Sequence, residues 1–380
     1  MSAPLGLYIH WPFCRARCPY CDFNVHIRNT IDHARWRDAL CAAIDHYAHL
    51  LPDRSLATLF FGGGTPSLMT PETISFVVDR ARKVWPGADD IEISLEANPS
   101  DHARFADFVG AGVTRLSLGI QALDDAALKT LGRDHDRAGA IAAIEAAHTH
   151  FTNVSFDLIY ARPKQSETAW RRELADALAL ARDHLSLYQL TIEPHTGFAT
   201  ARRQGLLDLP EDAAPLYEAA CALCEAAGFA HYEISNFARP GFESRHNLVY
   251  WRYGDYVGVG PGAHGRFRTD DGACVATVEE RSPERWLTAV EANGHAIVER
   301  TELTVDERLT ETLLMGLRLA EGVARDRFRA ETGGDFESKL SATNLSALTD
   351  ANLLVLDERG LRATEDGRQR LDAVLARLLG

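Results

Sequence analysis

The sequence lacks the features that mark membrane, secreted and nucleic-acid-binding proteins. It has no run of about 18 apolar residues that could cross a bilayer, and its first residues lack the basic start and apolar stretch of a secretion signal. We therefore expect a cytoplasmic protein, with peripheral membrane contact only through a partner. The chain has 40 Lys and Arg against 54 Asp and Glu, a formal net charge of -14, so nucleic acid is not an expected partner.

Internal repeats and low-complexity segments are also missing, and the chain has only seven cysteines. An odd number of cysteines without a secretion signal does not indicate a disulfide framework. What is present is the composition of a folded globular protein, with 46% apolar and 25% charged residues. The length of 380 residues predicts a core of about 200 to 250 residues with a smaller appended domain.

Short apolar runs alternate with longer segments of helical period in the first part of the chain. This alternation predicts parallel strands joined by helices, and six such units predict an incomplete (β/α)6 TIM-like barrel of the α/β class. The predicted strands are Gly6–Trp11, Thr58–Phe61, Ile91–Ala97, Arg115–Gln121, Asn153–Tyr160 and His184–Leu190. The predicted helices are Ile31–Leu50, Pro71–Val84, Asp101–Gly110, Asp136–Phe151, Ser166–Arg182 and Asp212–Gly228, with a shorter one near Ala126.

The pattern changes after about residue 232. Tyr232–Phe237 fits one more strand, and the Gly- and aromatic-rich stretch RHNLVYWRYGDYVGVGPGAHGRF is predicted to be a loop. Helices and the two-strand signal LLVLDERGLRAT follow from Thr304, which predicts a small helical, winged-helix-like C-terminal domain. Acidic residues outnumber basic ones there, so a structural or docking role is favoured over DNA binding. We expect a barrel over 1–235, a connecting region over 236–300 and the C-terminal domain over 301–380.

Three cysteines have the spacing C-x3-C-x2-C in HWPFCRARCPYCDF, directly after the first predicted strand. Thiolates are soft ligands for iron–sulfur clusters, zinc or Cu(I), and three of them leave one iron of a [4Fe–4S] cluster open. A structural zinc would need a fourth ligand, such as His10 or His26. The prolines and aromatic residues of the loop could shield a cluster from water, which favours a cluster on Cys14, Cys18 and Cys21.

Cys221 and Cys224 form a C-x2-C pair, which alone would suggest a redox or metal site. They lie inside the helical pattern PLYEAACALCEAAGF, and free Cys behaves as a small hydrophobe, so a buried apolar face is favoured. Cys41 and Cys274 have no supporting context.

The cysteine loop, followed by a second strand that runs into GGGTP, resembles the radical S-adenosylmethionine proteins. The ordered segments YIHWPFC, FFGGGTPS, SLEANP, RLSLGIQ, FDLIYARPKQ, LSLYQLTIEP and HNLVYW are similar to the family of anaerobic coproporphyrinogen III oxidases and their haem-chaperone relatives, over nearly the whole chain. The resemblance implies a radical S-adenosylmethionine core barrel that binds a [4Fe–4S] cluster and S-adenosylmethionine. It does not decide whether the chain cleaves S-adenosylmethionine reductively. The implied positions are Cys14, Cys18 and Cys21 for the metal, and Tyr8, Tyr20, Gly63, Gly64, Thr65, Glu96, Gln121, Arg133 and Asp157 for the cofactors.

The physical character of these positions agrees with the resemblance. Function gathers at the carboxyl ends of barrel strands because the loops that follow them converge there. Glycines after the second strand let the backbone approach a ligand closely, and the carboxylate of Glu96 could accept both hydroxyl hydrogens of a ribose. Each polar residue taken singly would be an ordinary strand-end cap.

The oxidase branch of this family is expected to carry a further cysteine two positions after the third and a long N-terminal extension. This sequence has Phe23 at that position, and its first cluster cysteine comes only 13 residues after the start. The resemblance therefore implies a haem chaperone that passes haem to an acceptor, such as a respiratory-chain haem protein, with a coproporphyrinogen oxidase as the alternative. His246 and Tyr250 match the haem-associated pattern H-N-x-x-Y of that branch. The sequence leaves the oligomeric state open, with a homodimer as one alternative.

Overall fold

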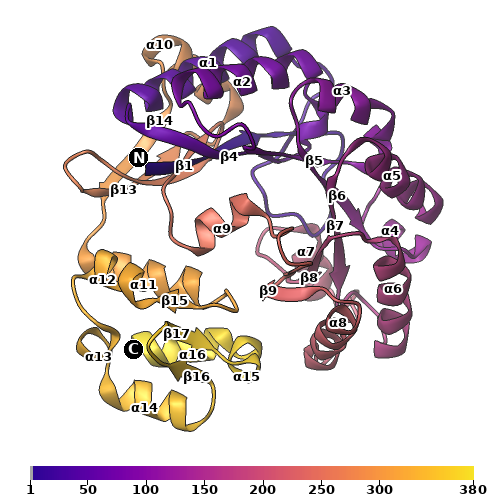
Figure 1. Cartoon of the computed structure of the whole chain (residues 1–380). Helices are drawn as coiled ribbons and strands as arrows, with labels where there is room; N and C mark the ends of the chain where they lie inside the picture. The colour runs from indigo at the N-terminus through magenta and orange to yellow at the C-terminus, as the bar shows by residue number, and fades with distance from the viewer. Residues whose placement is uncertain (1–2) are drawn as a thin grey trace.

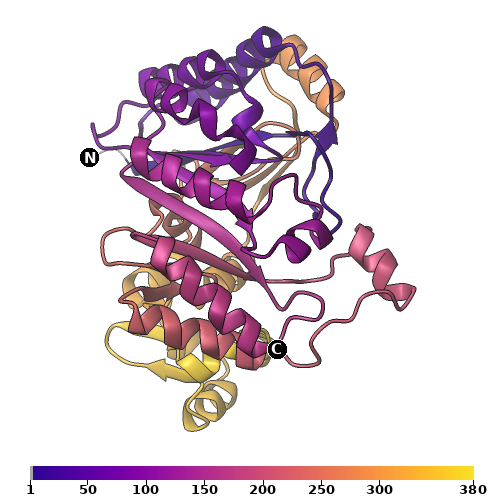
Figure 2. The same cartoon turned by 90° about the vertical axis from the view of Figure 1, so that its right-hand side faces the viewer.

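The computed structural model describes residues 3–380, and its main body is a strongly curved sheet covered by helices (Figure 1). Among these residues the largest sheet has twelve strands in the order β14-β13-β12-β11-β1-β4-β5-β6-β7-β8-β10-β9. The run from β1 to β8 is parallel throughout, and helices follow the outer side of the curve (Figure 2). These strands form the predicted incomplete (β/α)6 barrel, so the predicted fold class is confirmed.

The barrel elements lie close to their predicted ranges. The strands are β1 Ala3–Trp11, β4 Arg54–Gly63, β5 Glu92–Ala97, β6 Arg115–Gln121, β7 Asn153–Tyr160 and β8 His184–Gln189. The helices are α1 His33–Leu50, α2 Pro71–Val84, α3 Phe105–Gly110, α4 Asp125–Thr130, α5 Arg137–His150, α6 Glu167–Leu180, α7 Gly197–Arg203 and α8 Ala214–Ala226, with the 3-10 helices η1 Pro66–Leu68 and η2 Pro99–Arg104. Several helices begin where a side chain accepts a hydrogen bond from the backbone three residues on, as at Asp32, Thr70, Asp136 and Ser166.

The two faces of the barrel sheet differ in composition because side chains alternate along each strand. The outer face carries aliphatic residues such as Leu59 and Ile93, which are fully buried in the main core under the helices. The inner face carries polar and aromatic residues instead, such as Tyr8, and the hydroxyl of Ser155 donates to that of Ser117 at 3.0 Å. Large aliphatic side chains therefore do not fill the interior, and a ligand cavity remains at the strand ends.

The segment Tyr232–Phe237, predicted as one strand, forms a hairpin. Its two antiparallel strands are β9 (Ala230–Glu233) and β10 (Asn236–Ala238). The buried carboxylate of Glu233 accepts the backbone N–H of Ser235 at 3.0 Å and so holds the turn between them. The single-strand prediction is wrong because this side-chain contact, which reverses the chain, leaves no periodic signal.

The stretch from Arg245 that was predicted to be a loop is also structured. It contains α9 Arg245–Trp251, β11 Tyr256–Val259 and β12 His264–Arg268. β11 pairs in parallel with β1, and β12, β13 (Cys274–Glu279) and β14 (Ile297–Glu302) continue the sheet in antiparallel order. The loop prediction is wrong: β11 pairs with β1, about 250 positions earlier in the chain, and β12 and β13 add to its free edge. The boundary between the ranges 1–235 and 236–300 stays a prediction.

α10 (Pro283–Asn293) ties the added strands to the barrel. It packs against α1, where the rings of Trp36 and Trp286 stack with their centroids 5.4 Å apart. Both indoles are almost completely buried. The connecting region and the barrel therefore share one hydrophobic core.

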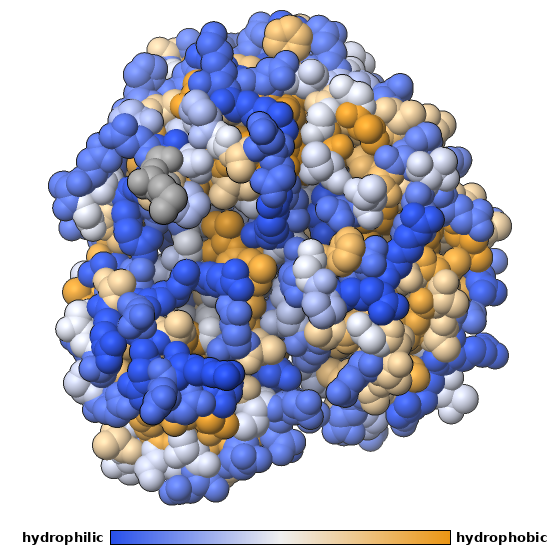
Figure 3. All heavy atoms as spheres, viewed as in Figure 1, coloured by the Kyte–Doolittle hydropathy of each residue, from blue (hydrophilic) through white to orange (hydrophobic). Residues whose placement is uncertain are grey.

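The C-terminal part has a core of its own and a small sheet in the order β15-β17-β16. Its elements are α11 Val305–Gly316, β15 Val323–Ala324, α12 Arg325–Thr332, α13 Phe336–Lys339, α14 Ala342–Asp350, β16 Leu354–Leu356, β17 Gly360–Ala363, α15 Glu365–Gln369 and α16 Leu371–Leu379. Helices followed by this hairpin agree with the predicted helical, winged-helix-like domain. On the face turned to the viewer in Figure 3, the upper part of this domain is hydrophilic and hydrophobic side chains show below it. Within residues 3–380, no helix is long and apolar enough to cross a bilayer.

Candidate functional site

The cysteine loop lies on the rim of the barrel between two short parallel strands, β2 (Phe13–Cys14) and β3 (His26–Ile27). The Sγ atom of Cys14 accepts a hydrogen bond from Thr65 Oγ1 at 3.3 Å. The N–H of Cys21 donates to the Cys18 carbonyl at 3.1 Å, which closes a tight turn between the second and third cysteines. Burial raises the pKa of Cys14 to about 11, although the Thr65 hydrogen bond lowers it, so the neutral thiol is the favoured form in the metal-free chain.

The glycines at the end of β4 allow this loop to lie against the barrel. The N–H of Gly64 donates to the Trp11 carbonyl at 2.7 Å. A Cβ atom on Gly64 would lie only 2.7 Å from the Phe13 carbonyl oxygen and 3.0 Å from Cys14 Sγ. Gly63 has a φ of 108°, which favours glycine, and a Cβ there would meet a histidine ring. A larger residue at Gly64 would push the cysteine loop away from β4, whereas one at Gly63 would displace the His10 ring.

Two carboxyl groups face the interior of the barrel. Glu96 Oε2 accepts the Gly63 N–H at 3.2 Å. Burial and the neighbouring Asp157 raise the pKa of Glu96 to about 8. Burial also raises the pKa of Asp157 to about 6, against the opposing effects of a Ser186 hydrogen bond and the Arg115 charge. At neutral pH, Glu96 is therefore mostly protonated and can both donate and accept a hydrogen bond, as a ribose hydroxyl requires.

Gln121 and Arg133 complete this side of the barrel. Gln121 ends β6 with a φ of 72°, a strained conformation for a non-glycine residue that often occurs at functional sites. Arg133 donates from Nη2 to the Gly119 carbonyl at 2.8 Å and from Nη1 to Cys18 Sγ at 3.5 Å. Its buried Nε has no hydrogen-bond partner within residues 3–380. A cation with an unpaired buried N–H fits an anionic group on a ligand.

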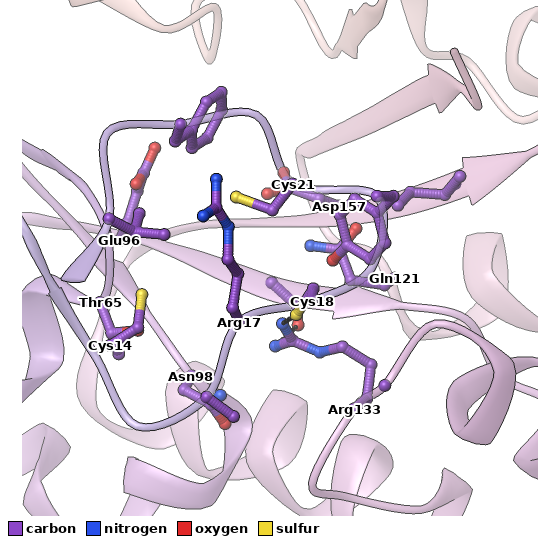
Figure 4. A pocket seen from close by; sticks show the side chains of 18 of the residues that line it. Cys14, Arg17, Cys18, Cys21, Thr65, Glu96, Asn98, Gln121, Arg133 and Asp157 are labelled. Carbon is purple, nitrogen blue, oxygen red and sulfur yellow. Dashed lines mark hydrogen bonds between the residues drawn. The ribbon is translucent and has the colours of Figure 1, made fainter. Parts of the chain in front are cut away.

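These side chains line one cavity of about 410 Å³ at the carboxyl ends of the strands (Figure 4). Its volume is typical of a small-molecule site. The predicted residues that line it are Cys14, Cys18, Tyr20, Cys21, Gly63, Gly64, Thr65, Glu96, Gln121, Arg133 and Asp157.

The groups around the cavity fit a cluster together with an amino-acid nucleoside. Three thiols supply soft ligands, and the far wall supplies carboxyl, amide and guanidinium groups. Across the described chain, no three His, Cys, Asp or Glu side chains converge as a single metal ion would require. His10 is not a free fourth ligand for zinc, because its Nδ1 bonds to Tyr8 and its Nε2 to the Asn24 carbonyl, both at 3.0 Å.

Several residues that line the cavity were not predicted. Asn98 and Tyr188 lie at the ends of β5 and β8, so the strand-end rule that selects Glu96 would also have selected them. Arg17 lies close to the labelled cysteines in Figure 4, but an arginine in a polar loop carries no sequence signal of its own. The full set of additional polar residues is Arg15, Arg17, Asp22, Asn98, Ser117, Asp134, Tyr188, Gln189, Thr191 and Glu193.

Three predicted residues lie outside this cavity. Tyr8 lines a neighbouring cavity, whereas His246 and Tyr250 lie on α9 inside the curve of the sheet (Figure 1). The His246 ring is 1% exposed, with Nδ1 2.8 Å from Thr58 Oγ1 and Nε2 2.7 Å from the Tyr250 hydroxyl. Burial lowers its pKa to about 3. Both ring nitrogens are engaged, so the ring holds α9 to the barrel as the chain is folded here. Its role in haem binding stays a prediction.

The other cysteines do not join the site. Cys224 is fully buried in the main core and Cys221 packs at its edge, 3.8 Å from His231 Nδ1. Their burial on one helix agrees with the predicted apolar face. Cys41 and Cys274 lie on α1 and β13, away from the residues that line the cavity.

A parallel α/β barrel that carries a C-x3-C-x2-C loop beside a glycine-rich strand end defines a radical S-adenosylmethionine protein. The sequence model of the Radical SAM superfamily matches residues 8–177, and that of the HemN C-terminal domain matches residues 303–370. "Heme chaperone HemW" of Escherichia coli is 37% identical over 87% of this chain and 86% of its own. The chain therefore belongs to the HemW-type family of radical S-adenosylmethionine proteins.

Other relatives extend the comparison. "Radical S-adenosyl methionine domain-containing protein 1, mitochondrial" of Bos taurus is 40% identical over 100% of this chain and 88% of its own. Among solved structures, the coproporphyrinogen III oxidase HemN of Escherichia coli superposes with a TM-score of 0.82 over 99% of this chain and 90% of its own. At 23% identity, that likeness speaks for the fold alone.

Proposed function

We propose that this chain is a haem chaperone that holds a [4Fe–4S] cluster on Cys14, Cys18 and Cys21, binds S-adenosylmethionine beside it, and passes haem to an acceptor protein. The observation that carries the proposal is that the three cysteines and eight further predicted residues line one cavity. The choice of chaperone rests on relatives at 34% to 37% identity that are named heme chaperones.

The residues of the cavity would divide the work of holding the cofactors. The three thiols would bind three irons, and the fourth iron would be open to the amino and carboxylate groups of S-adenosylmethionine. Gly63 and Gly64 would let the backbone approach the methionyl part, and Glu96 would hold the ribose hydroxyls. When bound, the cluster supplies an electron that can cleave the sulfonium.

The second candidate is an oxygen-independent coproporphyrinogen III oxidase, which the resemblance of the ordered sequence segments to that family keeps in view. Phe23 speaks against it, since the oxidase branch is expected to have a cysteine there. The Phe23 side chain is 57% exposed, so core packing does not require a phenylalanine. An exposed aromatic ring beside the cluster loop suits contact with a flat ligand.

Anaerobic reconstitution tests the proposal. The protein is loaded with iron and sulfide, and iron content, visible absorbance and S-adenosylmethionine binding are measured for the wild type and for Cys18→Ser. We expect cluster and cofactor binding in the wild type and their loss in Cys18→Ser, with Cys41→Ser as the matched control. The reconstituted protein is then given reductant, S-adenosylmethionine and coproporphyrinogen III. Catalytic turnover would reject the chaperone, whereas a stable haem complex without turnover is the expected result.

We also propose the division into a barrel over 1–235, a connecting region over 236–300 and a C-terminal docking domain over 301–380. Residues 1 and 2 lie outside the described residues. The C-terminal domain would contact the haem acceptor, which is expected to be a protein of the respiratory chain rather than a nucleic acid. The face of this domain seen in Figure 3 mixes hydrophilic and hydrophobic side chains, which suits a transient partner. A homodimer in the cytoplasm and peripheral membrane contact through the acceptor remain predictions.

A further inference from the structure

A second cavity of about 470 Å³ lies next to the cluster cavity. Phe23, Gly63 and Glu96 line both, so the two cavities adjoin. The second cavity is bounded by β1, the cysteine loop and the inner face of β12, β13 and β14, which Figure 1 shows continuing the sheet beyond β1. Sequence reasoning assigned no role to the β12–β14 side of this cavity, where Gly262 and His264 fall in a stretch that was predicted to be a loop.

His264 is the ligand-competent group in this cavity. It begins β12 and lies in register with Val278 of β13, which in turn pairs with Glu299 of β14, so the three side chains share one face. The His264 side chain is exposed, and no residue within 3–380 hydrogen-bonds to its ring. The other histidine of the cavity, His10, has both ring nitrogens engaged.

Burial in the cavity, helped by nearby cations, favours the neutral form of the His264 ring. Desolvation in the cavity and the cations Arg266 and Arg281 lower its pKa, and Glu299 only partly offsets them. A neutral imidazole has a free ring nitrogen, which is the form that binds haem iron.

The walls of the cavity suit the remainder of a haem. Phe23 and Tyr8 provide aromatic surface for a porphyrin ring. Arg281 makes no ion pair with any described residue, although most arginines nearby do, as Arg28 does with Glu284. An unpaired guanidinium at the cavity edge can bind a carboxylate such as a haem propionate.

Building on the proposed function, we propose that haem docks in this second cavity with His264 as its axial ligand and Arg281 at a propionate, and that His246 is not the ligand. When the imidazole of His264 coordinates the haem iron, it displaces a water ligand. The oxidation state of the iron does not change. The site adjoins the cluster cavity through Phe23 and Glu96, so haem would lie next to the cofactors without occupying their space.

Titration of the reconstituted full chain with ferric haem tests this site. The Soret band reports coordination, and the constant cluster absorbance is subtracted. We expect the spectrum of a histidine-ligated haem in the wild type. In His264→Ala this spectrum should be lost, and the affinity for haem should fall by at least about tenfold. Loss of a residue that only supports a metal ligand already lowers metal affinity by about that much. Added imidazole should restore the spectrum of His264→Ala.

Three further variants separate the outcomes. His150→Ala, at the exposed end of α5, is the matched histidine control and should match the wild type. Tyr250→Phe disturbs the His246 contact more gently than His246→Ala does, and both should retain the wild-type haem spectrum. Arg281→Ala should weaken binding without changing the spectrum type.

The outcomes that would overturn the two proposals differ. Loss of the spectrum in His246→Ala and Tyr250→Phe, together with an unchanged spectrum in His264→Ala, would overturn the His264 site and leave the chaperone standing. Absence of any haem spectrum in the wild type would overturn the proposed chaperone and the site with it.

Discussion

Replacing Gly64 by alanine tests whether the close approach of β4 to the cysteine loop is needed for cluster binding. The added Cβ would lie 2.7 Å from the Phe13 carbonyl oxygen and 3.0 Å from Cys14 Sγ. The first of these is a main-chain atom, which can move only together with β2. Gly64 does not have a positive φ, so the whole penalty is steric. Overpacking of this kind costs about 1 to 3 kcal/mol.

The cost should appear mainly in cluster affinity. The chain can relieve the overlap by moving the cysteine loop outward, and Cys14 then leaves the position from which it binds iron. A cost of 1 to 3 kcal/mol corresponds to cluster binding that is about 5- to 150-fold weaker. The measurement is iron and sulfide retained per chain during competition with a chelator under anaerobic conditions, with the midpoint of thermal unfolding recorded alongside.

Gly110→Ala is the matched control. It lies at the end of α3, its φ is not positive, and a Cβ there would meet nothing within 4 Å. We expect wild-type iron retention from it. If Gly64→Ala retained iron and unfolded as the wild type does, the steric reasoning would be refuted.

The remaining predictions concern hydrogen bonds and buried charge. Thr65→Val removes the hydrogen bond that lowers the Cys14 pKa, so the pH midpoint of iron uptake should rise by about one unit; an unchanged midpoint would contradict this. The pKa of Glu96 is raised in the fold from 4.5 to about 8, so the stability that its neutral form contributes is complete below about pH 4.5 and is lost as the pH rises toward 8. Glu96→Gln should flatten this part of the pH profile in urea denaturation, and a profile of equal slope would count against the assignment. Arg318→Ala removes the cation that lies 3.5 Å from the fully buried carboxylate of Glu233. This variant should lower the free energy of unfolding by about 1 to 3 kcal/mol. An unchanged free energy of unfolding would show that the ion pair is dispensable.

The parts of the fold that sequence reasoning predicted well are those with local signals. β6 and β7 have their predicted bounds because alternating apolar residues mark the strand, and α2 does so because Thr70 and a following proline mark its start. Most of the candidate site was implied by the resemblance to radical S-adenosylmethionine proteins, and the strand-end positions of Glu96 and Gln121 agree with it. The hairpin at Glu233 was missed because its turn depends on one side-chain contact, and β11 was missed because its partner β1 is distant in the chain.

The sequence by itself determined the barrel fold, through its alternating strands and helices. It also determined the chemical groups of the site, which are three thiols on one loop and a glycine-rich strand end. Only the tertiary structure decided which groups are free to act. The ring of His246 is engaged by Thr58, 188 positions earlier in the chain, whereas the ring of His264 is left exposed in a cavity. Burial and hydrogen-bond partners are set by contacts between distant segments, so no local pattern could tell these two histidines apart.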